Sequence, residues 1–315
     1  MKTNYFKLIS SMCILLLLAG GTDSFANPAA GGRRTGNSTK KEDKQMTVSE
    51  LRLSITDLNG KARTFRLTNP RPVSREVHFY PQTKAPNGFF LPRISSTTFV
   101  YKDQFTGDVQ KGGSCNVDIL GCVPHGLTHI ETSAHILVQD EHAVTIKDIP
   151  VQNLSGPVYV IDVSSLDAGA GTALQWQHIE KKLKNISLPV SMLAIKTKAS
   201  LLPQDTDFSG KDFLYLGPDT ARQLHDFKPQ IKCLLLDLPS IDREHDGGKL
   251  SAHRNFFGLP EKGHRHEDKE KRTLVELAWF SGLEEGYYYA FITPQRFQTN
   301  AVSTGIVFYS LQEIK

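Results

Sequence analysis

The sequence has little excess charge of either sign and none of the compositional extremes that mark unusual classes of protein. It holds 37 Lys and Arg against 33 Asp and Glu, a net charge of +4 over 315 residues. This small, scattered surplus does not favour a nucleic acid as the partner. A composition of 39% hydrophobic and 22% charged residues excludes collagen-like, coiled-coil and wholly disordered chains. We therefore expect a soluble globular protein.

Several common signatures of enzymes and metal proteins are also missing. No Gly-x-Ser-x-Gly turn is present, which excludes the usual serine nucleophile of α/β-hydrolases. Gly126 stands where a zincin helix would need Glu directly after its first His, here His125. The absence of a Cys-x-x-Cys pair excludes a zinc ribbon. A catalytic site has to be sought among other residues.

The chain has no apolar run long enough to span a membrane. The apolar run at residues 8–19 covers twelve positions, too few for a bilayer core of about 30 Å. Lys2 and Lys7 flank it on the amino-terminal side, and Ser24-Phe25-Ala26 fits a small-x-Ala cleavage site. We expect residues 1–26 to be a signal peptide cleaved after Ala26. The mature protein is then periplasmic or secreted, without a membrane span.

Cysteine is scarce, with four in the chain. Cys13 would leave with the signal peptide, so Cys115, Cys122 and Cys233 remain. Because this number is odd, at least one thiol stays unpaired within the chain. A short-loop Cys115–Cys122 disulfide and three buried thiols are the two alternatives.

The rest of the chain predicts one domain that is rich in strands. Residues 27–46 are small, polar and charged, which predicts a flexible leader before a domain at 47–315. Asn59-Gly60 predicts a hairpin turn, and the Pro-rich stretch 69–92 predicts an irregular loop with aromatic side chains. The charged segment 264–272 predicts an exposed insertion. Further strands are expected at 157–163, 192–196, 213–216, 231–238, 274–279, 287–292 and 306–311, with helices at 173–186 and 219–227, the second capped by Asp219 or Thr220.

The most informative segment is PHGLTHIETSAHI at 124–136, which gathers four side chains able to bind a metal or carry a proton. These are His125, His129, Glu131 and His135. In an extended strand His129 and Glu131 point to the same face, and His125 can join them after a turn through Gly126. Imidazole nitrogens combined with a carboxylate suit transition metals. The alternative is that these are ordinary histidines of a polar strand, but three of the 11 histidines in eleven residues make chance clustering less attractive.

This segment resembles the signature of the cyclase family of metal-dependent hydrolases, which includes kynurenine formamidase and isatin hydrolase. That signature is His-x-Gly-Thr-His-x-Asp-x-Pro-x-His, and its matching residues here are His125, Thr128, His129 and His135. Three positions depart from it: Leu127 replaces Gly, Glu131 replaces Asp and Ser133 replaces Pro. Glu can still bind a metal, although its extra methylene moves the carboxylate.

The resemblance extends from about residue 114 to 297. The stretch 146–163 is similar to the family's segment after the signature, including Gly-Pro before an apolar strand. LDLPSID at 236–242 resembles an Asp-x-Pro-Ser-x-Asp segment, in which we expect Asp237, Ser240 and Asp242 to organise a turn. The segments around His253 and Glu276 match those that bear a family histidine ligand and a glutamate ligand. The interval between the two is longer than usual, and the insertion at 264–272 accounts for it.

The resemblance implies a swivelling β/β/α fold, a homodimer or larger homo-oligomer, and a site of one or two divalent ions, zinc or manganese. It implies that His129, Glu131, His253 and Glu276 hold one ion. It also implies that His125 holds the second, which shares Glu131 and Glu276, and that His135 is the general acid/base. Such an ion can lower the pKa of bound water from about 15.7 to near 7 and polarise a carbonyl group.

We therefore expect an exported, metal-dependent hydrolase of a small-molecule amide or cyclic amide, similar to an arylformamidase. One alternative is a lactone hydrolase or dehydratase-like enzyme on the same scaffold, because carbonyl polarisation does not fix the leaving atom. The other is a non-catalytic periplasmic protein that binds a metal or ligand and has lost turnover.

Overall fold

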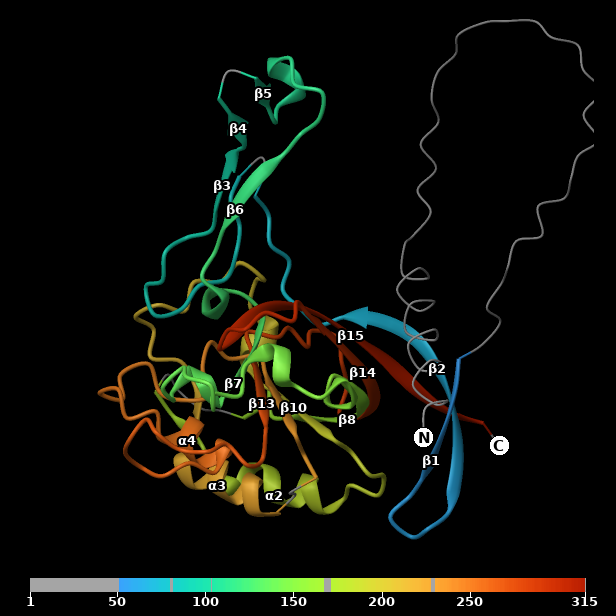
Figure 1. Ribbon diagram of the computed structural model, residues 1–315. Coiled ribbons are helices and arrows are strands. Elements are labelled where there is room, and N and C mark those ends of the chain that lie inside the picture. Colours follow the sequence, from blue (N-terminus) through green and yellow to red (C-terminus); the bar gives the residue numbers. More distant parts are fainter. Residues whose placement is uncertain (1–50, 80–81, 103, 167–170, 228–229, 315) are drawn as a thin grey trace, which may run out of the picture. The chain divides into compact units, whose positions relative to one another are not determined.

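A nine-stranded mixed sheet that closes on itself is the centre of the molecule (Figure 1). The computed structural model describes residues 51–79, 82–102, 104–166, 171–227 and 230–314, so the predicted signal peptide and leader lie outside the described residues. The strand order is β1-β2-β15-β14-β8-β10-β12-β13-β7, and β7 also pairs with β15. The strands are β1 (Arg52–Thr56), β2 (Ala62–Pro72), β7 (His129–Thr132), β8 (Ser155–Asp162), β10 (Met192–Lys196), β12 (Cys233–Leu236), β13 (Thr273–Glu276), β14 (Gly286–Pro294) and β15 (Ala301–Ile314).

Four neighbouring strands of this sheet, β8, β10, β12 and β13, run parallel. Parallel strands need crossover connections, and each connection here carries a helix. The helices are α2 (Trp176–Lys184), α3 (Pro218–Phe227) and α4 (Ser251–Phe257). Figure 1 shows them together along one side of the sheet. Three α-helices among the described residues, beside so many strands, confirm the predicted strand-rich fold with few helices.

Apolar side chains fill both faces of the parallel strands. On one face, Ile161, Leu193 and Leu234 pack with apolar residues of the three helices. On the other, Val160, Ala194 and Leu235 pack against β14 and β15. Side chains alternate between the faces of a strand, so strands buried on both sides have continuous apolar sequences. This explains why CLLL and the first four residues of MLAIK are apolar and could be recognised from sequence.

The predicted amino-terminal hairpin is present. β1 and β2 pair antiparallel, and Gly60 in the turn has a φ of +83°, which favours glycine. β2 continues to Pro72 because its end pairs with β15, where Arg71 lies opposite Phe308. The irregular loop predicted from residue 69 therefore begins later than expected. α3 also begins earlier than predicted, at Pro218, so Asp219 and Thr220 lie within its first turn and do not cap it.

A separate two-stranded ribbon carries two of the cysteines. Its strands β3 (Ser95–Thr98) and β6 (Asp118–Gly121) pair only with each other among the described residues, and a smaller pair, β4 (Val100–Tyr101) and β5 (Phe105–Thr106), lies between them in the chain. Cys115 and Cys122 lie on either side of β6, and both are free and exposed. An extended strand between them separates their Cα atoms by far more than the about 7 Å that a disulfide allows.

Neither alternative for the cysteines is therefore correct, because two thiols are exposed and one is buried. The buried one, Cys233, lies in β12, where burial raises the pKa of its thiol to about 12. A thiol with such a pKa stays protonated and behaves as a small apolar side chain.

No helix in the described part of the chain has both the length and the apolar character that crossing a bilayer requires.

Candidate metal centre

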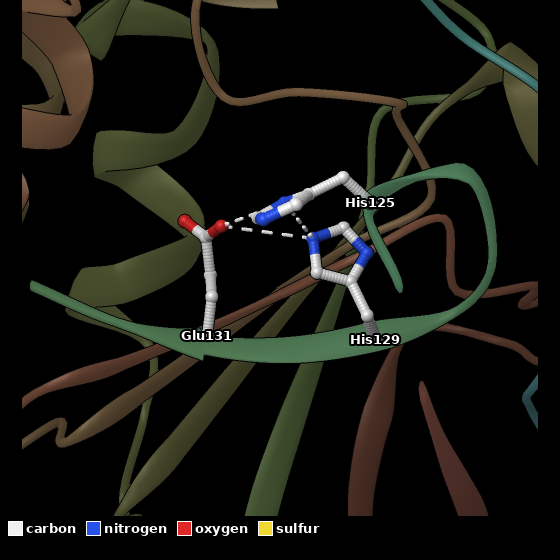
Figure 2. A group of neighbouring side chains, drawn as sticks. All are labelled: His125, His129 and Glu131. Carbon is white, nitrogen blue, oxygen red and sulfur yellow. Dashed lines mark hydrogen bonds and ion pairs between the residues drawn. The ribbon is translucent and has the colours of Figure 1, made fainter. Parts of the chain in front are cut away.

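Two of the predicted ligands share one face of β7. His129 and Glu131 are both fully buried, and His129 Nε2 lies 3.6 Å from Glu131 Oε2. Figure 2 shows both side chains rising from the same side of the strand. The spacing of two residues does this, because alternate side chains of a strand point the same way. The predicted common face is confirmed.

His125 reaches the same point from the loop before β7. A 3₁₀ turn at Pro124–Gly126 bends the chain back over the strand. His125 Nδ1 then lies 3.1 Å from His129 Nε2 and 3.3 Å from Glu131 Oε2 (Figure 2). The side chain of His125 is 23% exposed, so this edge of the cluster is open to solvent.

His253 and Glu276 come to the cluster from distant parts of the chain. Glu276 ends β13 and lies opposite His129 in the β13–β7 pairing, with 3.5 Å between Glu276 Oε2 and His129 Nε2. His253, in α4, places its Nε2 2.9 Å from Glu131 Oε1 and 3.7 Å from Glu276 Oε1. The cluster therefore lies at the carboxyl end of a parallel strand, where α/β proteins commonly bind ligands.

His135 lies beside these five residues. A 3₁₀ turn at Ser133–His135 follows β7 and turns the imidazole back, so that its Nδ1 lies 4.0 Å from Glu131 Oε2. Its ring lies 4.4 Å from that of His125 between centroids, and its side chain is 27% exposed. The structure thus brings together all six residues selected from the sequence.

The buried glutamates and histidines of the cluster shift each other's pKa. Burial alone would raise the pKa of Glu131, but electrostatic interactions with the surrounding histidines hold it well below its usual value. Burial alone would lower the pKa of His129, but Glu131 and Glu276 raise it to about 9. The pKa of His253 is raised in the same way, by Glu131 and Asp242 against burial. Buried carboxylates need positive charge beside them, so this site suits a cation.

His135 differs from the other histidines of the cluster. Burial lowers its pKa, and the neighbouring His253 and His125 lower it further, against the opposing effect of Glu131. Its imidazole is therefore neutral at pH 7 and able to accept a proton.

The donor atoms fit a divalent cation. Glu131 Oε2 is buried without a well-aligned hydrogen-bond donor among the described residues, although three imidazole nitrogens surround it. Two sets of side chains, His125–His129–Glu131 and Glu131–His135–His253, each place one ligand atom per residue within 4.8 Å of the others. Imidazole and carboxylate donors are ligands that zinc and manganese accept.

The other ring nitrogen of each inner histidine meets an oxygen atom. His129 Nδ1 donates to the Leu127 carbonyl oxygen at 2.8 Å, and His253 Nδ1 donates to Asp242 Oδ2 at 2.6 Å. Such contacts fix the tautomer and orient Nε2 toward the cluster, as they do around metal-binding histidines. From the sequence, Asp242 was expected only to organise a turn. Asn300, whose Oδ1 lies 3.2 Å from His125 Nε2, was not predicted to belong to the site. Asp237 does support a turn, since it accepts hydrogen bonds from Thr197 and Ser200.

The structure shows where the three residues that depart from the family signature lie. The side chain of Leu127 packs in a small apolar cluster with Ala85 and Ile94. Glu131 reaches both His253 and His125, so its longer side chain places the carboxylate between the two sets of donors. Ser133 begins the turn that carries His135.

Ser133 also ties this turn to the charged insertion, because its Oγ donates to Asp268 Oδ2 at 2.6 Å. The insertion at 264–272 is mostly exposed, as predicted, but Asp268 and Arg272 are buried. Arg272 donates to the His225 carbonyl oxygen and lies over the ring of Phe256. The insertion is therefore packed against the domain through these two residues.

Comparison with known proteins supports the same relationship. Residues 65–243, more than half of the chain, match the family model described as "Putative cyclase". The chain is 30% identical over 155 residues to a kynurenine formamidase of Bacillus cereus, an alignment that covers 47% of this chain and 63% of the relative. It is 26% identical over 163 residues to the kynurenine formamidase of Bacillus thuringiensis, covering 51% and 68%. The match thus spans less than two thirds of the first relative.

Solved structures show the same fold. Isatin hydrolase A from Labrenzia aggregata, bound to benzyl benzoate, superposes with a TM-score of 0.56 at 14% identity, over 76% of this chain and 93% of that one. Isatin hydrolase A from Ralstonia solanacearum gives 0.55 at 13% identity, over 78% and 92%. The family model, the relatives and the fold agree with the resemblance found in the sequence, and the chain belongs to the cyclase family.

Proposed function

We propose that the protein is a metal-dependent hydrolase that cleaves a carbon–nitrogen bond in a small-molecule amide or cyclic amide. The observation that carries this proposal is the buried Glu131 carboxylate, which has imidazole nitrogens of four histidines around it. The names of the relatives support it, because they are kynurenine formamidases and the structural neighbours include isatin hydrolases.

Each side chain of the cluster has a role in this proposal. His129, Glu131, His253 and Glu276 would hold one ion, and His125 would hold a second with Glu131 and Glu276. A divalent ion at this place supplies a water of lowered pKa and a Lewis acid for the carbonyl oxygen. His135, neutral at pH 7 and part-exposed at the edge of the cluster, accepts a proton and passes it to the leaving nitrogen. The two glutamates balance the positive charge.

Chelation tests this function directly. Protein stripped with a chelator is expected to lose hydrolysis of a panel of aryl formamides and cyclic amides, and to recover it when zinc or manganese is added back. A matched panel of lactones separates the alternatives: turnover of lactones alone would assign the leaving atom as oxygen. Full hydrolytic activity in the chelated protein would contradict the proposal, and a metal-loaded protein without any turnover would favour a binding protein.

We also propose that the chain forms a homodimer or larger homo-oligomer through the β3–β6 ribbon. Ile119 and Leu120 in β6 are 57% and 56% exposed, and Val100 in the adjoining β4–β5 pair is 59% exposed. A two-stranded ribbon is marginally stable in water, and clustered exposed apolar side chains indicate a protein contact.

The assembly has its own test. An Ile119→Asp/Leu120→Asp protein is expected to run as a monomer in light scattering coupled to gel filtration, whereas the unmodified protein runs as a multiple of that mass. Leu58→Asp is the control, because Leu58 is 54% exposed in the β1–β2 turn. A monomeric unmodified protein would exclude this assembly.

A further inference from the structure

Asn300 lies at the point where β15 begins and meets the cluster. The first residues of β15 pair with β7, with Ala301 opposite Glu131 and Ser303 opposite His129. The Asn300 carbonyl oxygen accepts a hydrogen bond from the Thr132 backbone N–H at 3.1 Å. This pairing fixes the Asn300 backbone beside the end of β7, and its side chain reaches His125.

The contact between Asn300 and His125 favours one of the two tautomers of the ring. Asn300 Oδ1 lies 3.2 Å from His125 Nε2. An amide oxygen only accepts hydrogen bonds, so this contact favours a hydrogen on Nε2 in the neutral ring of His125. Nδ1 then keeps its lone pair, and this is the atom that lies 3.3 Å from Glu131 Oε2. The opposite tautomer would place a hydrogen on Nδ1 and remove His125 as a ligand.

In His125, His129 and His253, the ring nitrogen that faces away from the cluster meets an acceptor oxygen, which anchors the ring. Of these three rings, His125 is held least firmly. His129 and His253 are almost fully buried. The anchor of His129 is the carbonyl oxygen of Leu127, two residues away. The anchor of His253 is the Asp242 carboxylate, which also accepts hydrogen bonds from the backbone N–H groups of Ala252 and His253. His125 is part-exposed on a short turn, and its anchor is a neutral amide 175 positions away. Its orientation therefore depends most on a side chain that a substitution can remove.

We propose that Asn300 is a positioning residue that holds His125 in the Nε2–H tautomer and thereby makes Nδ1 a ligand for the second divalent ion. This inference rests on the metal centre described under Proposed function. It assigns Asn300 no contact with substrate or metal. It predicts that loss of the amide oxygen weakens one ion and leaves the other in place.

Isothermal titration calorimetry of the metal-free protein with zinc tests the inference without an activity assay. The unmodified protein is expected to bind two equivalents. In Asn300→Ala, the second equivalent should weaken by about 10- to 100-fold, the usual effect of losing a partner of a metal-binding histidine. Asn300→Asp keeps an acceptor oxygen and is expected to restore the second equivalent. Gln298→Ala, an exposed amide two residues earlier, is the control.

Nitrogen-15 NMR of the metal-free protein reads the tautomer of His125 itself. We expect Nε2–H in the unmodified protein and in Asn300→Asp, and a mixture of tautomers in Asn300→Ala. A His125 ring protonated at Nδ1 in the unmodified protein would overturn the inference. So would equal binding of both ions by the unmodified protein and Asn300→Ala, or failure of Asn300→Asp to restore binding. An unmodified protein that takes up no zinc would instead overturn the proposed metal centre, while the NMR result would still report on Asn300.

Discussion

Glu131→Gln is expected to abolish stable metal binding and to lower kcat/KM by more than about 10³-fold. The reason is the position of Glu131: one carboxylate oxygen lies 2.9 Å from His253 Nε2 and the other lies 3.3 Å from His125 Nδ1. Glutamine keeps the shape but replaces an acceptor by an N–H donor and removes the negative charge that both ions share. Loss of a single oxyanion donor costs about 10²–10³-fold, and loss of the ion removes more than one such interaction. Mass spectrometry of the dialysed protein measures the metal, beside the kinetic assay.

The matched control for this substitution is Glu141→Gln. Glu141 lies ten residues further along the chain and is 83% exposed, so the same chemical change should leave metal content and turnover unaffected. Far-UV circular dichroism verifies that Glu131→Gln folds. A folded Glu131→Gln protein that retains its full metal content would show that this carboxylate is not a ligand, and the proposed centre would have to be abandoned.

The part of the site that sequence could predict is the part that is local in the chain. His129 and Glu131 share a face because a strand alternates its side chains, and His125 lies in the three-residue turn just before that strand. This geometry depends only on spacing. His253 and Glu276 were assigned only through the family resemblance, because no local pattern indicates that α4 and β13 meet β7.

Contacts between segments that are far apart in the chain could not be predicted from the sequence. Asn300 is an ordinary polar residue before a strand until β15 pairs with β7. Asp242 was assigned to a turn, but its distance of 2.6 Å from His253 Nδ1 depends on how α4 packs. The same limit applies to the fold. Largely apolar segments such as Met192–Lys196 predicted strands correctly. The closure of the sheet through β7 and β15, in contrast, involves residues that are 170 or more positions apart in sequence. Non-local pairing leaves no periodic signal.

His135→Ala is expected to lower kcat by about 10²–10⁴-fold with little change in metal content. His135 is the most exposed histidine of the cluster, and its Nδ1 lies 4.0 Å from Glu131 Oε2, the longest of the distances from that oxygen to a histidine. A residue at the edge of a cluster, neutral at pH 7, suits proton transfer better than metal binding.

Two measurements distinguish proton transfer from metal binding or a purely structural role. Removal of the imidazole leaves a space that added imidazole can enter, so part of the lost rate should return in its presence, whereas the His142→Ala control, at a side chain that is 76% exposed, should behave as the unmodified protein does. Metal lost from His135→Ala would assign His135 to the ligand set, as the neighbouring Glu131 and His253 would allow. Full metal content without rescue by imidazole would exclude a role in proton transfer that a free imidazole can replace. Full metal content together with rescue requires a group that moves protons and does not hold the ion, because a ligand or a structural residue would not give both results.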